Sequence, residues 1–278
     1  DLRSFPLMIS FCGLPYIDVR VSFNSFIPAG ISDELANKLV NFYIDKLCEQ
    51  PNHHDKVEFE IIDSCYSLDL PERLKILKSK GFSLQECSEL QDGLRTLTNN
   101  IISKNGLWKR DIEKIQVLEA RRKIVVESDL NDIEKIYWLI EDCKRYGTLP
   151  FAGLARAGFI AIQMLRSLTA VGILSEEDRE TFMSTLNTVS SSLAKDLSSS
   201  QKKSFLEKYG HLRPGTYDVQ SPRYDEAPDT YFDWDQRKPL EGGLVTQNDF
   251  KPSLTALNKI AKLLKHHDLA HDILSFFD

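Results

Sequence analysis

The sequence predicts a mainly α-helical fold with a small β element at the N-terminus. From about residue 67 onward, apolar residues recur at steps of three and four almost without interruption, which is typical of amphipathic helices. Before that point, two runs alternate apolar and polar residues, which is typical of strands. We therefore expect a strand/helix/strand element at residues 1–66. A helical domain should follow at 67–278, form one compact unit and carry a functional loop at 209–235.

The N-terminal element is predicted to begin with a hairpin. The runs Leu7–Phe11 and Tyr16–Phe23 are separated by Cys-Gly-Leu-Pro, and the alternation in the second run predicts a half-buried strand. A helix is expected from about Ser32 to Gln50, because Pro51 would stop it there. Alternating residues at 57–61 then predict a third strand.

The helical domain is divided by capping signals. Ser83 and Glu86 form a capping box at the start of one helix. Glycine is favoured just past a helix end, so Gly147, Gly172 and Gly210 are expected to end three later helices. The helix at 150–171 has apolar or small residues on most faces and should be the most buried. The predicted helices are 84–105, 107–127, 129–146, 150–171, 175–197, 202–209, 251–266 and 268–276.

Composition narrows the class of protein. A net charge of −6 argues against a dominant nucleic-acid footprint, so no nucleic-acid partner is expected. The five cysteines are odd in number and far apart, as in a cytosolic protein that keeps its thiols reduced. Neither a signal-peptide layout nor a long uninterrupted apolar run is present. We therefore expect a cytoplasmic protein without a membrane partner.

The segment Phe205–Glu226 is the most informative stretch of the chain. A short helix ends at Tyr209-Gly210, where glycine is expected to supply a left-handed exit conformation. Pro214, Gly215 and Pro222 exclude a regular helix or a central strand from the loop that follows. Acids, bases, bidentate donors and aromatic rings in one stiff loop are typical of a binding site. The polar and aromatic residues of this loop are His211, Arg213, Tyr217, Asp218, Arg223, Tyr224, Asp225 and Glu226.

Two interpretations of this loop stay open, because bidentate pairs of arginine with carboxylates serve both structure and ligand contact. A structural network is expected at Arg223, Tyr224, Asp225 and Glu226. His211 and Arg213 lie just past the helix end and are expected to face a cleft. His211 has no partner nucleophile in the sequence, so no catalytic residue is assigned.

The same loop resembles a segment of the phosphoenolpyruvate synthase and pyruvate phosphate dikinase family, which includes rifampin phosphotransferases. The family pattern runs roughly Tyr-Gly-His-Arg-Gly-Pro-Gly-Glu-x-Asp and then Pro-Arg-Trp, ahead of the phosphohistidine domain. Here the matching residues are in Tyr209–Asp218 and Pro222–Tyr224. Pro15–Ala29 resembles the strand that enters the family's central region, and Ala155–Leu168 resembles the long buried helix of that region.

The resemblance implies a role without turnover of its own. The chain would be the central, substrate-side or docking region of a phosphoenolpyruvate-synthase-like phosphotransferase, which is an ATP- or phosphoenolpyruvate-dependent kinase. Its partners would be the flanking ATP-grasp and phosphohistidine domains of the parent chain and a small-molecule phosphoryl acceptor. ATP and Mg would serve the parent, with no cofactor in this fragment. The implied substrate-binding residues are His211, Arg213, Tyr217, Asp218 and Arg156.

Missing motifs support this interpretation. The sequence has no glycine-rich phosphate loop and no histidine in the setting of the family's phosphorylated residue, so we expect a piece of a larger protein. A helical interaction or scaffold module is the alternative. A metal-dependent phosphohydrolase is a weaker one, suggested by the spacing of His267 and His271 on one helix face. The remaining ligands of such a site are not identifiable, so no metal site is predicted.

Overall fold

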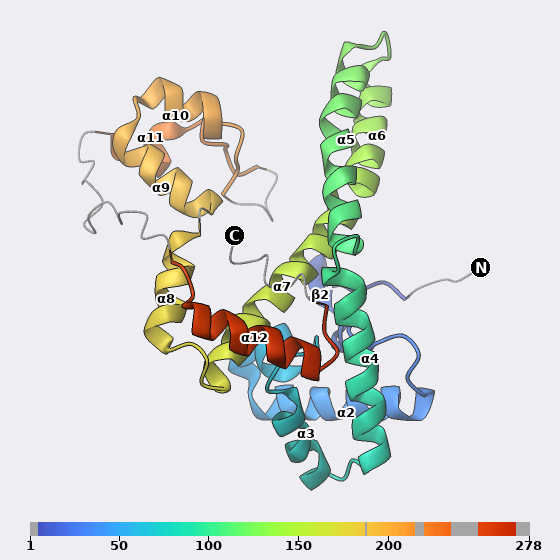
Figure 1. Cartoon of the computed structure of the whole chain (residues 1–278). Coiled ribbons are helices and arrows are strands. Elements are labelled where there is room, and N and C mark those ends of the chain that lie inside the picture. The colour runs from blue at the N-terminus through green and yellow to red at the C-terminus, as the bar shows by residue number, and fades with distance from the viewer. Residues whose placement is uncertain (1–4, 187, 215–219, 235–249, 271–278) are drawn as a thin grey trace. The chain divides into compact units, whose positions relative to one another are not determined.

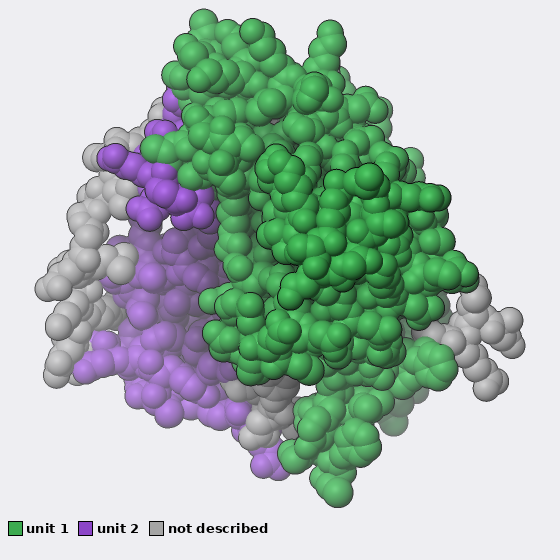
Figure 2. Space-filling model, turned by 90° about the horizontal axis from the view of Figure 1, so that it is seen from below, with its two compact units in different colours: residues 1–175, 252–278 green, residues 176–251 purple. Residues whose placement is uncertain are grey.

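The computed structural model describes residues 5–186, 188–214, 220–234 and 250–270 (Figure 1). Helix makes up 68% of the structure, about twice the average of globular proteins, and confirms the mainly α-helical prediction. The chain divides into two compact units: unit 1 with residues 1–175 and 252–278, and unit 2 with residues 176–251 (Figure 2). The boundary expected at residue 66 stays a prediction.

The N-terminal hairpin is confirmed, but its second strand is short. Strand β1 (Met8–Phe11) pairs antiparallel with β2 (Leu14–Ile17), and the turn residues Cys12 and Gly13 have φ of 51° and 81°. Positive φ at both positions is the mark of the two-residue turns that suit a twisted hairpin.

The strand predicted to run to Phe23 is wrong beyond Ile17. Asp18 accepts a hydrogen bond from the Val21 amide at 3.1 Å and starts helix α1 (Val19–Asn24). Val19 and Phe23 are one helical turn apart, and Phe23 is buried. The strand residues themselves are mostly exposed, so the half-buried strand is wrong as well.

The third predicted strand, at 57–61, is also wrong. Val57–Ile61 forms a π-helical turn, η2, in which the Ile62 amide donates to the Val57 carbonyl. It follows helix α2 (Asp33–Glu49) and the 3-10 turn η1 (Pro51–His53). The residues that alternate in the sequence therefore lie on a tight turn, in which Ile61 is buried.

The core of unit 1 includes helices α2, α3 (Leu70–Ser79) and α4 (Leu84–Ile102). The capping box at the start of α4 is confirmed, with Glu86 accepting from the Ser83 amide at 2.6 Å and Ser83 accepting from the Glu86 amide at 3.1 Å. The fully buried large side chains of these helices and their connections are Leu35, Leu39, Tyr43, Ile61, Ile62, Tyr66, Leu70, Leu90 and Leu94.

A two-helix hairpin follows α4. Helix α5 (Leu107–Glu127) packs against α6 (Asp132–Asp142) and also against the helix that follows, and the end of the hairpin near its turn projects away from the rest of unit 1 in Figure 1. Asp142 is 2% exposed and accepts from Arg121 Nε at 2.7 Å, which raises the pKa of the arginine. This ion pair fastens the base of the hairpin.

Gly147 does not end a helix, contrary to the prediction. Helix α6 continues through the π-helical segment η3 (Cys143–Thr148) into α7 (Leu149–Ala170), and Gly147 lies within η3. A Cβ added to Gly147 would come within 3.3 Å of Leu118 of α5, so close packing is the reason for this glycine. Gly172 has φ of 71° and ends α7, as predicted.

Helix α7 was predicted to be the most buried helix, and this is confirmed only for its second half. Its buried residues include Ile160, Met164, Leu165 and Leu168, whereas Phe151 near its start is 66% exposed. By length and composition alone, the continuous helix Asp132–Ala170 could cross a membrane, a test that the core helices of other proteins also pass. Arg156, Gln163 and Arg166 of α7 all bond to other elements of unit 1.

The chain returns to unit 1 with helix α12 (Leu254–His266). Its buried residues are Ala256, Ile260 and Leu264. Asn99 of α4 then holds the chain beyond α12, donating to the Asp268 carbonyl at 2.9 Å and accepting from the Ala270 amide at 2.8 Å. Of the helix predicted at 268–276, the described residues 268–270 are not helical, and 271–276 lie outside the described residues.

Unit 2 is built from four helices of the described chain. They are α8 (Glu176–Thr185), α9 (Val189–Ser199), α10 (Lys202–Tyr209) and the short α11 (Pro228–Tyr231). The single helix predicted at 175–197 is two helices, because Thr188 and Ser191 form a capping box that starts α9.

Candidate functional site: the loop after helix α10

The base of the loop is a cluster of aromatic rings around Phe205 of α10. Phe205 is fully buried, and its ring centroid lies 4.9 Å from Tyr209, 5.1 Å from Phe232 and 5.7 Å from Trp234. Most of these contacts are edge-on, the arrangement that aromatic pairs prefer. The residues on both sides of the loop are therefore fixed to one hydrophobic centre.

Two backbone hydrogen bonds close the loop. The Asp225 amide donates to the Gly210 carbonyl at 3.0 Å, and the Tyr224 amide donates to the Leu212 carbonyl at 3.0 Å. Residues 209–212, the start of the first segment that carries the resemblance, thus lie beside the second segment at 222–224.

Gly210 does not have the left-handed conformation that the sequence analysis expected. Its φ is −56° and its ψ is −31°. A Cβ at this position would clash with the Leu206 carbonyl and would lie 2.8 Å from Cβ of Asp225. Glycine is favoured because the segment at Asp225, where the chain returns from the loop, lies close to the end of α10.

Arg223 lies in a surface network with Asp225 and Glu226. Its Nε and Nη2 donate to both carboxylate oxygens of Asp225 at 2.9 Å, and Glu226 accepts from the Arg223 amide at 2.8 Å. The side chains of Arg223, Asp225 and Glu226 are 42%, 38% and 47% exposed. An ion pair this exposed contributes about 0–1 kcal/mol, so the network orders the turn more than it stabilises the fold.

Tyr224 and Tyr231 anchor this turn from below. The Tyr231 hydroxyl donates to the Pro222 carbonyl at 2.8 Å, and the Tyr224 ring lies 4.7 Å from Phe232 and 5.3 Å from Tyr231. Tyr224 therefore packs with the rings below the loop, and its assignment to a structural network stays a prediction.

His211 and Arg213 differ in their surroundings. His211 is exposed at the end of α10. Arg213 is half-buried, and its Nη1 donates to the Ser221 carbonyl across the loop. Arg213 thus also binds the backbone of the loop and resembles Arg223 in this respect. That Arg223 is structural while Arg213 faces a cleft stays a prediction. Tyr217 and Asp218 lie outside the described residues.

Asp196 of α9 joins this site, and the sequence analysis missed it. It accepts from Lys208 Nζ at 2.7 Å and from the Tyr209 hydroxyl at 2.8 Å. These two bonds lower the pKa of Asp196, and the Asp196 carboxylate in turn raises the pKa of Lys208. No local spacing signals this triad, because Asp196 is on a different helix.

Arg156 lies in unit 1 and is not part of the loop's own unit. Its Nη2 donates to the Ser25 carbonyl at 3.0 Å, and its guanidinium lies 5.2 Å from the Phe26 ring centroid. Partial burial lowers its pKa. Within the part of the chain that the structure describes, it has no carboxylate in ion-pair distance, whereas Arg166 pairs with Glu60 at 3.0 Å.

The histidines after α12 do not form a metal site among the described residues, which hold no cluster of three potential ligands. Nδ1 of His267 lies 2.8 Å from the hydroxyl of buried Tyr66, which gives this histidine a structural partner. Burial, followed by the charges of His266 and Arg95, lowers its pKa. His271 and Asp272 lie outside the described residues.

A cavity of about 500 Å³ in unit 1 was also missed. Lys46, Asp63 and Arg73 line it, and Arg73 donates to Asp63 at 2.8 Å while Lys46 donates to the Ile61 carbonyl at 3.0 Å. Burial lowers the pKa of Lys46. Lys46 and Arg73 therefore already have acceptors, and Asp45, Glu49 and Lys80 line the same cavity.

Comparison with protein-family models, curated proteins and solved structures found no match. The loop after α10 therefore has to be interpreted from its own geometry. That geometry offers exposed polar groups on a rigid support and, among the described residues, no nucleophile with a base beside it.

Proposed function

We propose that this chain is a non-catalytic, substrate-side or docking region of a phosphoenolpyruvate-synthase-like phosphotransferase. The observation that carries the proposal is the loop after α10. It places the exposed His211 next to a segment held by two backbone hydrogen bonds and an aromatic cluster. A rigid support with a few exposed polar groups suits recognition of an anionic group.

The described chemistry favours binding over turnover. Several ionisable groups around the loop are engaged with one another, as in the triad of Asp196, Lys208 and Tyr209. Histidine and arginine are suited to phosphate and carboxylate groups. The ligand class proposed for His211 and Arg213 is therefore a small phosphorylated or carboxylated molecule.

A titration tests this assignment. Phosphoenolpyruvate and inorganic phosphate are added to ¹⁵N-labelled protein, and amide shifts are followed by NMR. Shifts centred on 209–213 and 221–226 are expected, with a Kd near 1 mM, about −4 kcal/mol. His211→Ala should weaken binding at least several-fold, whereas His54→Ala, an exposed histidine of unit 1, should not. The absence of any shift near the loop would reject the substrate-side role.

A helical interaction module is the second candidate function. One observation favours it: the apolar side chains of α6 that are exposed, including Ile133 at 80% and Tyr137 at 57%. A non-catalytic module that joins proteins would need such a surface. The titration distinguishes the two, since an interaction module has no reason to bind phosphate at the loop.

A further inference from the structure

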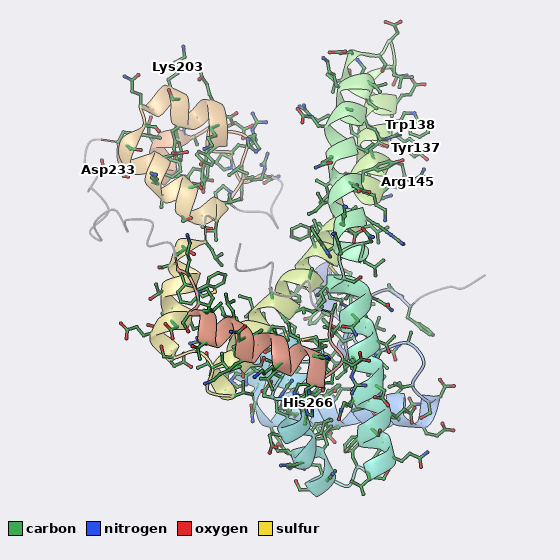
Figure 3. The ribbon with its side chains drawn as sticks, viewed as in Figure 1. Tyr137, Trp138, Arg145, Lys203, Asp233 and His266 are labelled. Atoms are coloured by element: carbon green, nitrogen blue, oxygen red, sulfur yellow. The ribbon has the colours of Figure 1, made fainter. Side chains whose placement is uncertain are left out.

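Helix α6 presents its apolar face to solvent. Ile133, Ile136, Tyr137 and Ile140 follow one another at steps of three, one and three residues, so they share one face. Their exposures are 80%, 57%, 57% and 51%. We call these four residues the outer stripe. Figure 3 shows Tyr137, together with Trp138 and Arg145, projecting outward from the hairpin.

The opposite face of α6 is the one that packs against α5. Its members are Lys135, Leu139 and Asp142, half-buried or buried at steps of four and three. Lys135 donates to the Val126 carbonyl of α5, and Asp142 pairs with Arg121 of α5. The polar contacts of α6 thus face its partner helix, and the outer stripe faces away, which reverses the usual pattern of a surface helix. Several large apolar residues in a row on an exposed face mark an interaction site.

We propose that the outer stripe is the interface of a homodimer, in which α6 packs antiparallel against α6 of a second copy. This interface goes beyond the function proposed for the loop and does not depend on it. The distribution of charge along α6 favours a second copy of the chain as the partner that covers the stripe.

The two ends of α6 carry opposite charge. The first turn holds Asp132 and Glu134. Just past the other end, in η3, lie Lys144 and Arg145, which share the carboxylate of Glu141 at 2.8 and 3.5 Å. Asp142 is already paired with Arg121 of α5, so this stretch is net positive. In an antiparallel pair related by a twofold axis near Tyr137, the acidic end of each helix meets the basic end of the other. Such self-complementarity is what an isologous interface requires.

Other arrangements fit the charges less well. A parallel pair would bring like charges together at both ends, which is unfavourable. An anionic lipid surface would be repelled by the acidic end, and helices that lie on membranes carry lysine and arginine along the whole polar face. The interface is short, because α6 has 11 residues, so the dimer should be weak.

Sedimentation velocity on the full chain, from about 1 µM to about 1 mM, tests the proposal. A dimer that forms with rising concentration is expected. Ile136→Glu should weaken it at least about tenfold, because it places a charge at the centre of the stripe. Ile124→Glu is the matched control: Ile124 is 69% exposed on α5 and lies outside the stripe, so the dimer should persist.

A charge exchange tests the antiparallel register. Asp132→Arg alone and Arg145→Asp alone should each weaken the dimer, and the double variant should restore it. Circular dichroism should show wild-type helix content throughout. If Ile136→Glu does not fold, the charge exchange carries the test.

Three outcomes would overturn the proposal. The first is a wild-type chain that stays monomeric over the whole concentration range. The second is a dimer that Ile136→Glu leaves intact, which would place the interface elsewhere. The third is a monomer that binds vesicles of phosphatidylcholine and phosphatidylserine through the stripe, which would make lipid the occupant.

Discussion

At the scale of single residues, several polar side chains serve the fold although the sequence made them look functional. His267 is the clearest case. It stands in a run of histidines and aspartates, yet its Nδ1 lies 2.8 Å from the hydroxyl of Tyr66, a residue that is fully buried. The guanidinium of Arg95 covers the Tyr66 ring at 5.2 Å. Tyr66 and His267 therefore link α12 to the core of unit 1.

This contact predicts a pH dependence of stability. Burial lowers the pKa of His267 in the folded protein, so the unfolded chain takes up this proton more readily. The contribution of neutral His267 to the free energy of unfolding is fully present above the unfolded pKa of about 6.5 and is lost as the pH falls below that value. His267→Gln cannot titrate, so its melting temperature should fall less between about pH 7 and pH 5. His54→Gln, at an exposed position, should keep the wild-type slope; equal slopes in all three proteins would contradict the prediction.

At the scale of elements, the aromatic cluster should decide the stability of unit 2. Phe205 is 0% exposed and touches rings on both sides of the loop. Phe205→Ala should destabilise this unit by about 3–5 kcal/mol, because a large cavity opens at its centre. Urea unfolding followed by the fluorescence of Trp234, which lies in the cluster, measures the loss. Val189→Ala, at a position 73% exposed in the same unit, should change it little; a small loss for Phe205→Ala would show that the loop is held elsewhere.

Elements with local signals were predictable, and those set by distant neighbours were not. Helix α4 followed from its capping box and its regular apolar spacing. The alternation at Tyr16–Phe23 was misinterpreted as a strand. Every second residue of the alternating series is four positions from the last, so Val19 and Phe23 also share one face of a helix, and Asp18 caps that helix. Gly147 was misinterpreted as a helix end because the close packing of Leu118, on another helix, favours a residue without a Cβ there.

The candidate site divides in the same way. The network of Arg223, Asp225 and Glu226 spans only a few residues, so a single loop sequence could indicate it. The bond between Tyr209 and Asp196 joins two helices, and nothing in the spacing points to it. The resemblance implied a substrate-binding role for Arg156, which stays a prediction; its described partners are Ser25 and Phe26 of unit 1.

At the scale of the whole molecule, the two surfaces with proposed roles lie in different units. Unit 2 carries the loop segment with His211, and unit 1 carries the outer stripe of α6. A phosphorylated small molecule is the ligand proposed for the first, and a second copy of the chain for the other. Neither surface holds, within its described residues, the paired nucleophile and base that turnover would need.

The non-catalytic role proposed above predicts that the chain by itself does not perform phosphoryl transfer. Incubation with radiolabelled ATP or phosphoenolpyruvate should leave the protein unlabelled and should release no phosphate above background. The His211→Ala variant controls for the one exposed histidine of the loop. A phosphohistidine that appears on the wild-type chain and is absent from His211→Ala would assign that residue a catalytic role and contradict the prediction.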